Sequence, residues 1–318
     1  MITLKDIQLA QTRIRGIAVR TPLLAYPGSA PNRSLFLKPE NLQPMGAFKL
    51  RGAYNAIASL TPAERERGVV THSSGNHAQA VAYAARALGV KAIIVIPSNA
   101  PKIKIDKTKG YGAEVVLVGN SSEERLAKFE SLAKERNLVP VPPYDDERVM
   151  AGQGTIGLEI LEDLPDAELA LVPVSGGGLI SGIAAALKLS RSNIKVIGVE
   201  PELAADAQES LRSGTLTGYT AEQVSRTIAD GLRVQKLGAL TWPHIQAYVD
   251  DIVTVSEDEI RNAMRTLAFE ARLVAEPSGA VPFAAWLYRQ NELPAARQTV
   301  AVISGGNVEP QVLAQVLA

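Results

Sequence analysis

The run Ala92-Ile93-Ile94-Val95-Ile96 limits the folds open to this chain most strongly. Consecutive apolar, β-branched residues indicate a strand that is covered on both faces, as in a parallel sheet between layers of helices. Further runs of this kind alternate with longer segments of helical periodicity, and glycine or proline stands at the joints. This alternation predicts α/β architecture.

The pattern also indicates where the elements lie. The predicted strands cover Val69 to His72, Lys91 to Ile96, Glu114 to Val118, Leu169 to Val174, Lys195 to Glu200 and Thr299 to Ser304. The predicted helices cover Asn76 to Leu88, Ser122 to Asn137, Met150 to Leu161, Leu179 to Leu189, Glu257 to Ala271 and Ser278 to Arg289. A chain of 318 residues has room for two domains, and the proline-rich segment Val139 to Pro143 indicates a crossing between them.

Charge and composition narrow the partners. The 33 Lys and Arg residues balance 33 Asp and Glu residues, so neither nucleic acid nor an anionic membrane is an expected partner. The absence of cysteine excludes disulfides and zinc sites built on sulfur. No apolar run approaches the ~18 residues of a membrane span, and the charged N-terminus does not resemble a signal peptide. We therefore expect a cytoplasmic protein with a small-molecule partner.

The run Ser175-Gly176-Gly177-Gly178-Leu179 follows a predicted strand and opens a predicted helix. Glycines allow an anion to approach the backbone, and the N–H groups and dipole of the first helical turn bind phosphate. A simple tight turn is the alternative. A dinucleotide site that uses Glu200 on the ribose is another, although Ser181 stands where the third glycine of that motif belongs. A nucleotide-binding oxidoreductase therefore stays open at this point.

The segment Gly46-Ala47-Phe48-Lys49-Leu50-Arg51-Gly52-Ala53 presents a lysine between aromatic, aliphatic and small neighbours. A lysine at a helix start is usually a solvated surface residue. Apolar surroundings, however, can lower the pKa of the amine and make it a nucleophile toward an aldehyde. Lys49 is thus a candidate for a covalent cofactor linkage.

This segment is similar to the cofactor-lysine motif of fold-type-II pyridoxal-phosphate (PLP) enzymes of the serine/threonine dehydratase and serine racemase family. Further segments resemble the same family in the same order, namely Thr71 to Gln79, Ser175 to Leu179, Val274 to Gly279 and Ser304 to Asn307. One departure is Met45, which stands where the family commonly has threonine or serine. The resemblance implies a tryptophan synthase β-like fold with two three-layer α/β domains and the cofactor between them.

The resemblance also implies roles for single residues around PLP. Lys49 would hold the cofactor as a Schiff base and remove the substrate's α-proton. Residues Ser175 to Leu179 would bind the cofactor phosphate, Asn76 would donate to the 3′-oxygen, and Ser304 would face the pyridine nitrogen. The full predicted cofactor site consists of Phe48, Lys49, Asn76, Ser175, Gly176, Gly177, Gly178, Leu179, Gly231, Glu276 and Ser304.

The predicted substrate site lies at the start of the helix near Asn76. It consists of Ser73, Ser74, Gly75, Asn76 and His77, which would bind the substrate carboxylate, and of Arg125 near the entrance. Ser74 is also a candidate for the second catalytic acid and base that racemisation needs, since Lys49 serves one face of the α-carbon. Helix capping is the alternative role for Ser74, Asn76 and His77.

A divalent cation is a further implication of the resemblance. Glu200, Asp206 and the Ala204 carbonyl match the cation site of serine racemases, with hard oxygen ligands that suit Mg²⁺, Ca²⁺ or Mn²⁺. Ordinary surface charge is the alternative for these two acids.

Taken together, we expect elimination of water from L-serine or L-threonine to give a 2-oxo acid and ammonia, with serine racemisation beside it. A dedicated racemase and a 3-hydroxyaspartate dehydratase are the alternatives within the family. The large domain is expected from residues 1–52 and 144–318, and a small substrate-closing domain from residues 53–143. The expected assembly is a homodimer.

Overall fold

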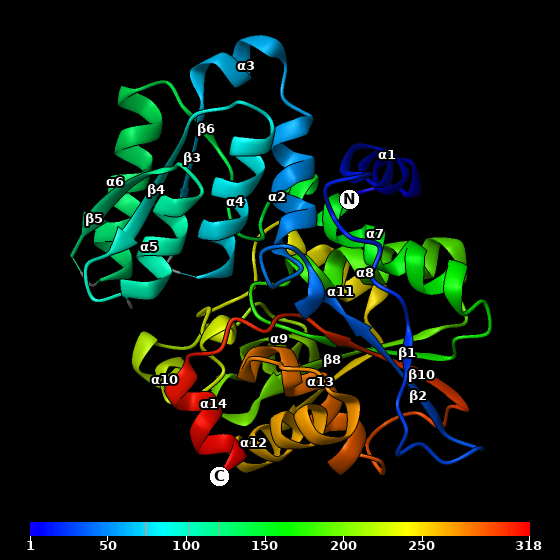
Figure 1. Cartoon of the computed structure of the whole chain (residues 1–318). Coiled ribbons are helices and arrows are strands. Elements are labelled where there is room, and N and C mark those ends of the chain that lie inside the picture. Colours follow the sequence, from blue (N-terminus) through cyan, green and yellow to red (C-terminus); the bar gives the residue numbers. More distant parts are fainter. Residues whose placement is uncertain (74, 101, 120) are drawn as a thin grey trace.

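The computed structural model describes residues 1–73, 75–100, 102–119 and 121–318, and it contains two separate sheets (Figure 1). The six-stranded sheet has the order β1-β2-β10-β7-β8-β9, and the four-stranded sheet has the order β5-β4-β3-β6. All pairs are parallel except β1 with β2, which are antiparallel. The carboxyl ends of parallel strands lie on one edge of a sheet, where α/β proteins bind their ligands.

The six-stranded sheet draws its strands from both ends of the chain: β1 (Leu24–Ala25), β2 (Ser34–Pro39), β7 (Leu169–Pro173), β8 (Lys195–Pro201), β9 (Asp251–Val255) and β10 (Gln298–Ile303). Alternate residues of these strands enter different cores. Leu169 and Leu171 pack with α12 (Glu257–Thr266) and α13 (Pro277–Tyr288), whereas Ala170 and Val172 pack with α7 (Glu147–Asp163) and α8 (Gly178–Ser190). Strand β7 is apolar and buried at every residue because helices cover both of its faces.

The four-stranded sheet repeats this three-layer design on a smaller scale. Its strands are β3 (Val69–His72), β4 (Ala92–Pro97), β5 (Glu114–Val118) and β6 (Val139–Pro140). Ile94 and Ile96 of β4 face α2 (Lys49–Ala58) and α4 (Asn76–Ala87), while Ile93 and Val95 face α6 (Ser122–Glu135). In Figure 1 this sheet and its helices form a lobe apart from the larger sheet.

The remaining elements connect or flank these layers. They are α1 (Leu4–Ile14), η1 (Glu40–Leu42), α3 (Pro62–Arg67), α5 (Lys102–Gly110), η2 (Glu202–Ala204), α9 (Asp206–Ser213), α10 (Ala221–Ser225), η3 (Asp230–Leu232), α11 (Thr241–Tyr248), η4 (Leu267–Ala271) and α14 (Pro310–Leu317). Among the described residues, no helix combines the length and the apolar composition that crossing a bilayer requires.

The predicted strands and helices are confirmed to within a few residues at their ends. Two segments differ from expectation. The proline-rich crossing begins as strand β6, which pairs with β3, and the predicted helix from Glu257 continues beyond Thr266 as a π-helix. The domain boundaries stay a prediction, and the one placed after residue 52 falls within α2.

Candidate active site

Lys49 is the first residue of α2, at the junction between the two sheets. Its Nζ donates to the main-chain oxygen of Pro143 at 2.6 Å and lies 5.1 Å from the centre of the Phe48 ring. Burial lowers the pKa of Lys49 to about 8, because the surroundings solvate the ammonium poorly. An amine with this pKa is more readily available as a nucleophile near neutral pH than an exposed lysine.

The glycine-rich segment forms the expected turn between β7 and α8. Gly177 has a φ of +92°, in the left-handed region where a side chain would be strained. Gly178 is the first residue of α8, so the free N–H groups of the first helical turn lie next to the loop. The Ser175 hydroxyl is buried and has no hydrogen-bond partner among the described residues. This segment therefore fits a phosphate group, which needs several convergent donors.

A polar cluster joins both sheets beside Lys49. Asn76, at the start of α4, donates through Nδ2 to Glu276 Oε1 at 2.7 Å and accepts from Asn307 Nδ2 at 2.8 Å. Burial, and secondly the charge of Asp230, raise the pKa of Glu276 to about 7. An amide nitrogen carries two protons, so Asn76 keeps one for a further acceptor such as the 3′-oxygen of PLP.

Main-chain contacts connect the lysine segment with the end of β10. The N–H of Phe48 donates to the Ser304 oxygen at 3.0 Å, and this serine is buried. Gly231 is also a predicted cofactor residue, and its N–H donates to Ser278 Oγ at 2.9 Å. Ser278 lies on the first turn of α13, two residues after Glu276. The structure thus brings most of the predicted cofactor residues to the ends of β7, β10, α2 and α13.

The predicted substrate loop lies between β3 and α4. The Gly75 N–H donates to Ser73 Oγ at 3.3 Å, and α4 begins at Asn76 with Gly75 as its N-cap. Asn76 is therefore not the capping residue, and its side chain contacts Glu276 instead. Ser74 lies outside the described residues, so its catalytic role stays a prediction.

Two histidines and Arg125 lie near this loop. His77 contacts the Val141 carbonyl through Nε2 at 2.9 Å, and burial, followed by the Lys49 charge, lowers its pKa to about 3. Burial, and secondly the charge of Arg125, lower the pKa of His72 to about 4. Both histidines are therefore neutral near pH 7, and Arg125 lies on the small-sheet side of the site.

The predicted cation ligands lie between the end of β8, which contains Glu200, and the start of α9 at Asp206, with Ala204 in η2. Glu200, Ala204 and Asp206 are buried, and the Asp206 Oδ2 atom accepts no hydrogen bond from any described residue. Glu200 accepts from the N–H groups of Ala207 at 3.2 Å and Gln208 at 2.8 Å. Burial, and then the neighbouring Asp206, raise the pKa of Glu200.

Two adjacent buried carboxylates of this kind fit a divalent cation, which would neutralise their repulsion. Among the residues with described placement, no group of three His, Cys, Asp or Glu side chains is arranged to hold a metal ion. The expectation of ordinary surface charge is wrong for this pair, since neither carboxylate is exposed.

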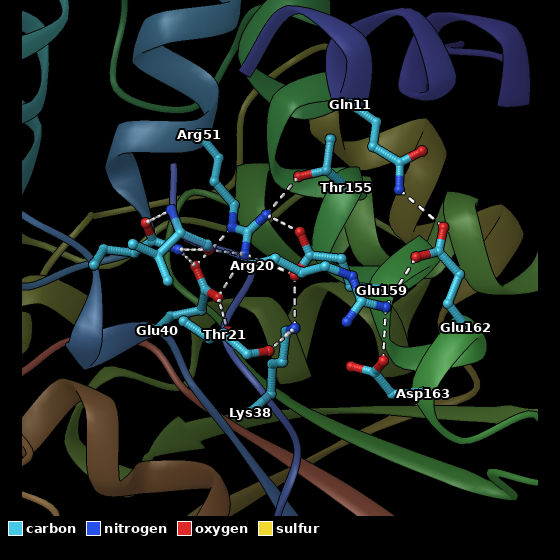
Figure 2. A network of polar contacts seen from close by, with 12 residues as sticks. Gln11, Arg20, Thr21, Lys38, Glu40, Arg51, Thr155, Glu159, Glu162 and Asp163 are labelled. Carbon is cyan, nitrogen blue, oxygen red and sulfur yellow. Dashed lines mark hydrogen bonds and ion pairs between the residues drawn. The ribbon is translucent and has the colours of Figure 1, made fainter. Parts of the chain in front are cut away.

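A buried charge cluster lies beneath the start of α2, and sequence analysis did not assign it a role (Figure 2). Arg51, two residues after Lys49, binds the Glu40 carboxylate at 2.7 Å and the Glu159 carboxylate at 2.6 Å. Lys38 binds the other oxygen of Glu159 at 2.6 Å. Arg51 and Lys38 are fully buried, so two positive and two negative charges balance away from water. This cluster fastens the lysine-bearing helix to β2 and α7.

Helix α7 also approaches both functional helices through glycines. A Cβ atom added to Gly152 would lie 2.6 Å from the Arg51 oxygen of α2, and one added to Gly182 of α8 would lie 2.2 Å from the Met150 oxygen of α7. Both are backbone atoms, so neither position accepts a side chain without displacement. One helix therefore holds the lysine-bearing helix and the glycine-loop helix together.

The family model described as pyridoxal-phosphate dependent enzyme matches residues 14–305, which include Lys49, the glycine loop, Asn76, Glu276 and Ser304. The chain belongs to this family. The Lys49 amine, the glycine loop and the Asn76 cluster fit the cofactor's aldehyde, phosphate and 3′-oxygen, respectively. The nucleotide-binding oxidoreductase is thereby set aside, and Glu200 bonds to the amides of α9 instead of standing free for a ribose.

Similar proteins come from the same family. The L-threonine ammonia-lyase of Thermotoga maritima is 46% identical over 323 residues, which cover 100% of this chain and 78% of that protein. The L-threonine dehydratase catabolic TdcB of Escherichia coli K12 is 43% identical, covering 99% and 96%. The serine racemase structure from Dictyostelium discoideum has a TM-score of 0.91 at 39% identity, covering 97% of this chain and 99% of that one. The predicted fold-type-II architecture is confirmed.

Proposed function

We propose that the chain eliminates water from L-threonine or L-serine and releases a 2-oxo acid and ammonia. The observation that carries this proposal is the half-buried Lys49 amine, with its pKa lowered to about 8, placed between the two sheets beside the Asn76 cluster. The names of the L-threonine ammonia-lyase and L-threonine dehydratase relatives support this reaction. When bound, PLP withdraws electrons from the substrate's α-carbon and makes its proton acidic.

The chain's own residues supply binding and proton transfer. Lys49 Nζ would hold the cofactor and, once the substrate had taken its place, would accept the α-proton. The first turn of α4 offers N–H groups to the substrate carboxylate. The β-hydroxyl leaves as water, and hydrolysis of the released enamine consumes one water and yields the 2-oxo acid and ammonia. By the resemblance, Ser304 would face the pyridine nitrogen with a hydroxyl and not a carboxylate, which would favour elimination over transamination.

The test follows absorbance and oxo-acid release together. The purified protein should absorb near ~410–420 nm, borohydride should abolish this band, and L-threonine or L-serine should yield oxo acid. Lys49→Ala should lose both the band and turnover. Lys102→Ala is the matched control, because the Lys102 side chain is 87% exposed, and it should keep both. An unchanged absorption band and full turnover in Lys49→Ala would overturn the assignment of Lys49.

Racemisation of serine is a second proposed activity, supported by the likeness to the Dictyostelium discoideum serine racemase. If Ser74 supplies the second acid and base, Ser74→Ala should keep elimination from L-serine and lose D-serine formation. Equal loss of both reactions would contradict this role. 3-Hydroxyaspartate carries a second carboxylate, which Arg125 would bind. Arg125→Ala should therefore lose turnover of 3-hydroxyaspartate and keep turnover of serine.

We further propose a structural divalent cation, Mg²⁺ before Ca²⁺ or Mn²⁺, held by Glu200, Asp206 and the Ala204 carbonyl. The buried carboxylates support it. The homodimer and the cytoplasmic location rest on the resemblance and on the charge-balanced, cysteine-free sequence. Sedimentation of the purified protein and fractionation of cells test these two proposals.

A further inference from the structure

Tyr144 connects the two ends of the proposed cofactor site. It follows Pro143, whose carbonyl accepts from Lys49 Nζ at 2.6 Å. Its ring lies over Gly176, where an added Cβ atom would be 2.5 Å from Cγ and Cδ2 and 2.6 Å from Cδ1 of the ring. Nearly equal distances to these three atoms mean that the ring presents its face to the glycine. One residue therefore borders both the lysine and the glycine loop.

The main chain of Tyr144 is held at the same place. A Cβ atom added to Gly178 would lie 2.9 Å from the Cα and Cβ atoms of Tyr144. The next residue, Asp145, accepts from the N–H groups of Leu240 at 2.8 Å and Ala239 at 3.1 Å, which anchors this segment to the start of α11. The ring position is thus set by backbone packing on both sides.

The substitution pattern of the PLP ring indicates which part of the substrate would lie near Tyr144, and this step rests on the proposed function. The aldehyde and the phosphate arm of PLP stand on adjacent ring carbons, so Lys49 and the glycine loop border one edge of the cofactor. The 3′-oxygen, assigned to Asn76, stands on the other side of the aldehyde. A substrate with its carboxylate at the Ser73 to His77 loop then directs its side chain toward the glycine loop, where Tyr144 lies.

We infer that the Tyr144 ring forms the wall of the pocket for the substrate's β-carbon substituent and makes the enzyme prefer L-threonine over L-serine. The methyl group of threonine would pack on the aromatic face. Burial, followed by the charges of Asp145 and Asp206, raises the pKa of Tyr144, so the phenol is neutral at physiological pH. Burying one methyl group at about 0.8 kcal/mol corresponds to about a fourfold preference at equilibrium.

The test uses ligands that cannot lose water. L-2-Aminobutyrate and L-alanine are threonine and serine without the hydroxyl, and their binding to the holoenzyme is measured by calorimetry. The wild type and Tyr144→Phe should bind aminobutyrate about fourfold more tightly than alanine, or better. Tyr144→Ala should bring this ratio close to one. Tyr288→Ala is the matched control, since Tyr288 is 42% exposed at the end of α13, and it should keep the wild-type ratio.

Two results would overturn the inference. One is an unchanged ratio in Tyr144→Ala, and the other is a ratio in Tyr144→Phe that falls as far as in Tyr144→Ala, which would assign the effect to the hydroxyl. If Tyr144→Ala fails to fold, Tyr144→Asn provides the same comparison with a smaller polar side chain. Oxo-acid release by the wild type tests the proposed function alone, so its failure is distinguishable from an unaltered binding ratio.

Discussion

Replacing Arg51 with methionine should destabilise the protein strongly, because it removes one member of a balanced buried cluster. Lys38 would then face two carboxylates, and among the described residues Thr21 and Gln43 would still donate hydrogen bonds to Glu40. Breaking a buried ion pair from one side costs about 3–5 kcal/mol. With about 2.1 cal/mol/K of unfolding entropy per residue over 318 residues, this lowers the melting temperature by about 4.5–7.5 °C.

The assay is thermal unfolding at several pH values, with Arg51→Met/Glu40→Gln as the compensated variant. That double variant leaves the Lys38 and Glu159 pair intact at 2.6 Å and should regain part of the lost stability, because Glu40 no longer carries an uncompensated charge. In the wild type, burial raises the pKa of Glu40, but the charge and hydrogen bonds of the Arg51 guanidinium lower it by more. The pKa of Glu40 therefore lies below its ordinary value.

The wild-type ion pair therefore adds stability above the unfolded pKa of Glu40, and this stability is lost as pH falls through the folded value. Without Arg51, burial raises the pKa of the Glu40 carboxyl instead. The difference in stability between the wild type and Arg51→Met should therefore shrink as pH falls toward the pKa of Glu40 in the unfolded chain. A melting temperature within about 1 °C of the wild type, or no recovery in the double variant, would refute this reasoning.

Three further results are expected. Gly182→Ala should lower the melting temperature, since its Cβ would lie 2.2 Å from the Met150 oxygen and overpacking costs about 1–3 kcal/mol; Gly110→Ala, with nothing within 4 Å, should not. Burial raises the pKa of Glu276 to about 7 in the folded protein. The contribution of the protonated carboxyl to folding stability is therefore lost as pH rises toward that value. Cofactor-free wild type should therefore lose stability relative to Glu276→Gln as pH rises to about 7, and parallel curves would contradict this. A chelator should lower the melting temperature of the wild type but not of Asp206→Asn, because cation binding stabilises the folded state; a chelator-insensitive wild type, after verified metal removal, would count against the site.

The sequence predicted the buried strands well because their signal is local. Helices cover β4 and β7 on both faces, so every residue of these strands is apolar and the pattern is visible without tertiary information. Strand β2 was missed because it contains Lys38 and ends at Pro39, which argue against a buried strand. The charge of Lys38 is stabilised by Glu159, 121 residues away in sequence, and by the Thr21 main-chain oxygen at 2.6 Å.

The site was predictable to the extent that it uses contiguous motifs. Lys49, the glycine loop and the Asn76 loop each stand in a recognisable segment. Tyr144 and the Arg51 cluster carry no such signal, since their roles depend on Gly176 and Glu159 in distant elements. Glu276 is an intermediate case: its position follows from a motif, but its raised pKa comes from burial and Asp230, which a motif does not reveal.

The glycine contacts of α7 indicate how this scaffold can be engineered. Because backbone meets backbone at Gly152 and Gly182, the spacing between the amine of Lys49 and the glycine loop does not depend on any side chain that binds substrate. A position outside these contacts, such as Arg125, can therefore be randomised in a library without changing the spacing of the residues that would bind the cofactor. Variation at the helix crossings, by contrast, would yield mostly inactive clones whatever the substrate selected.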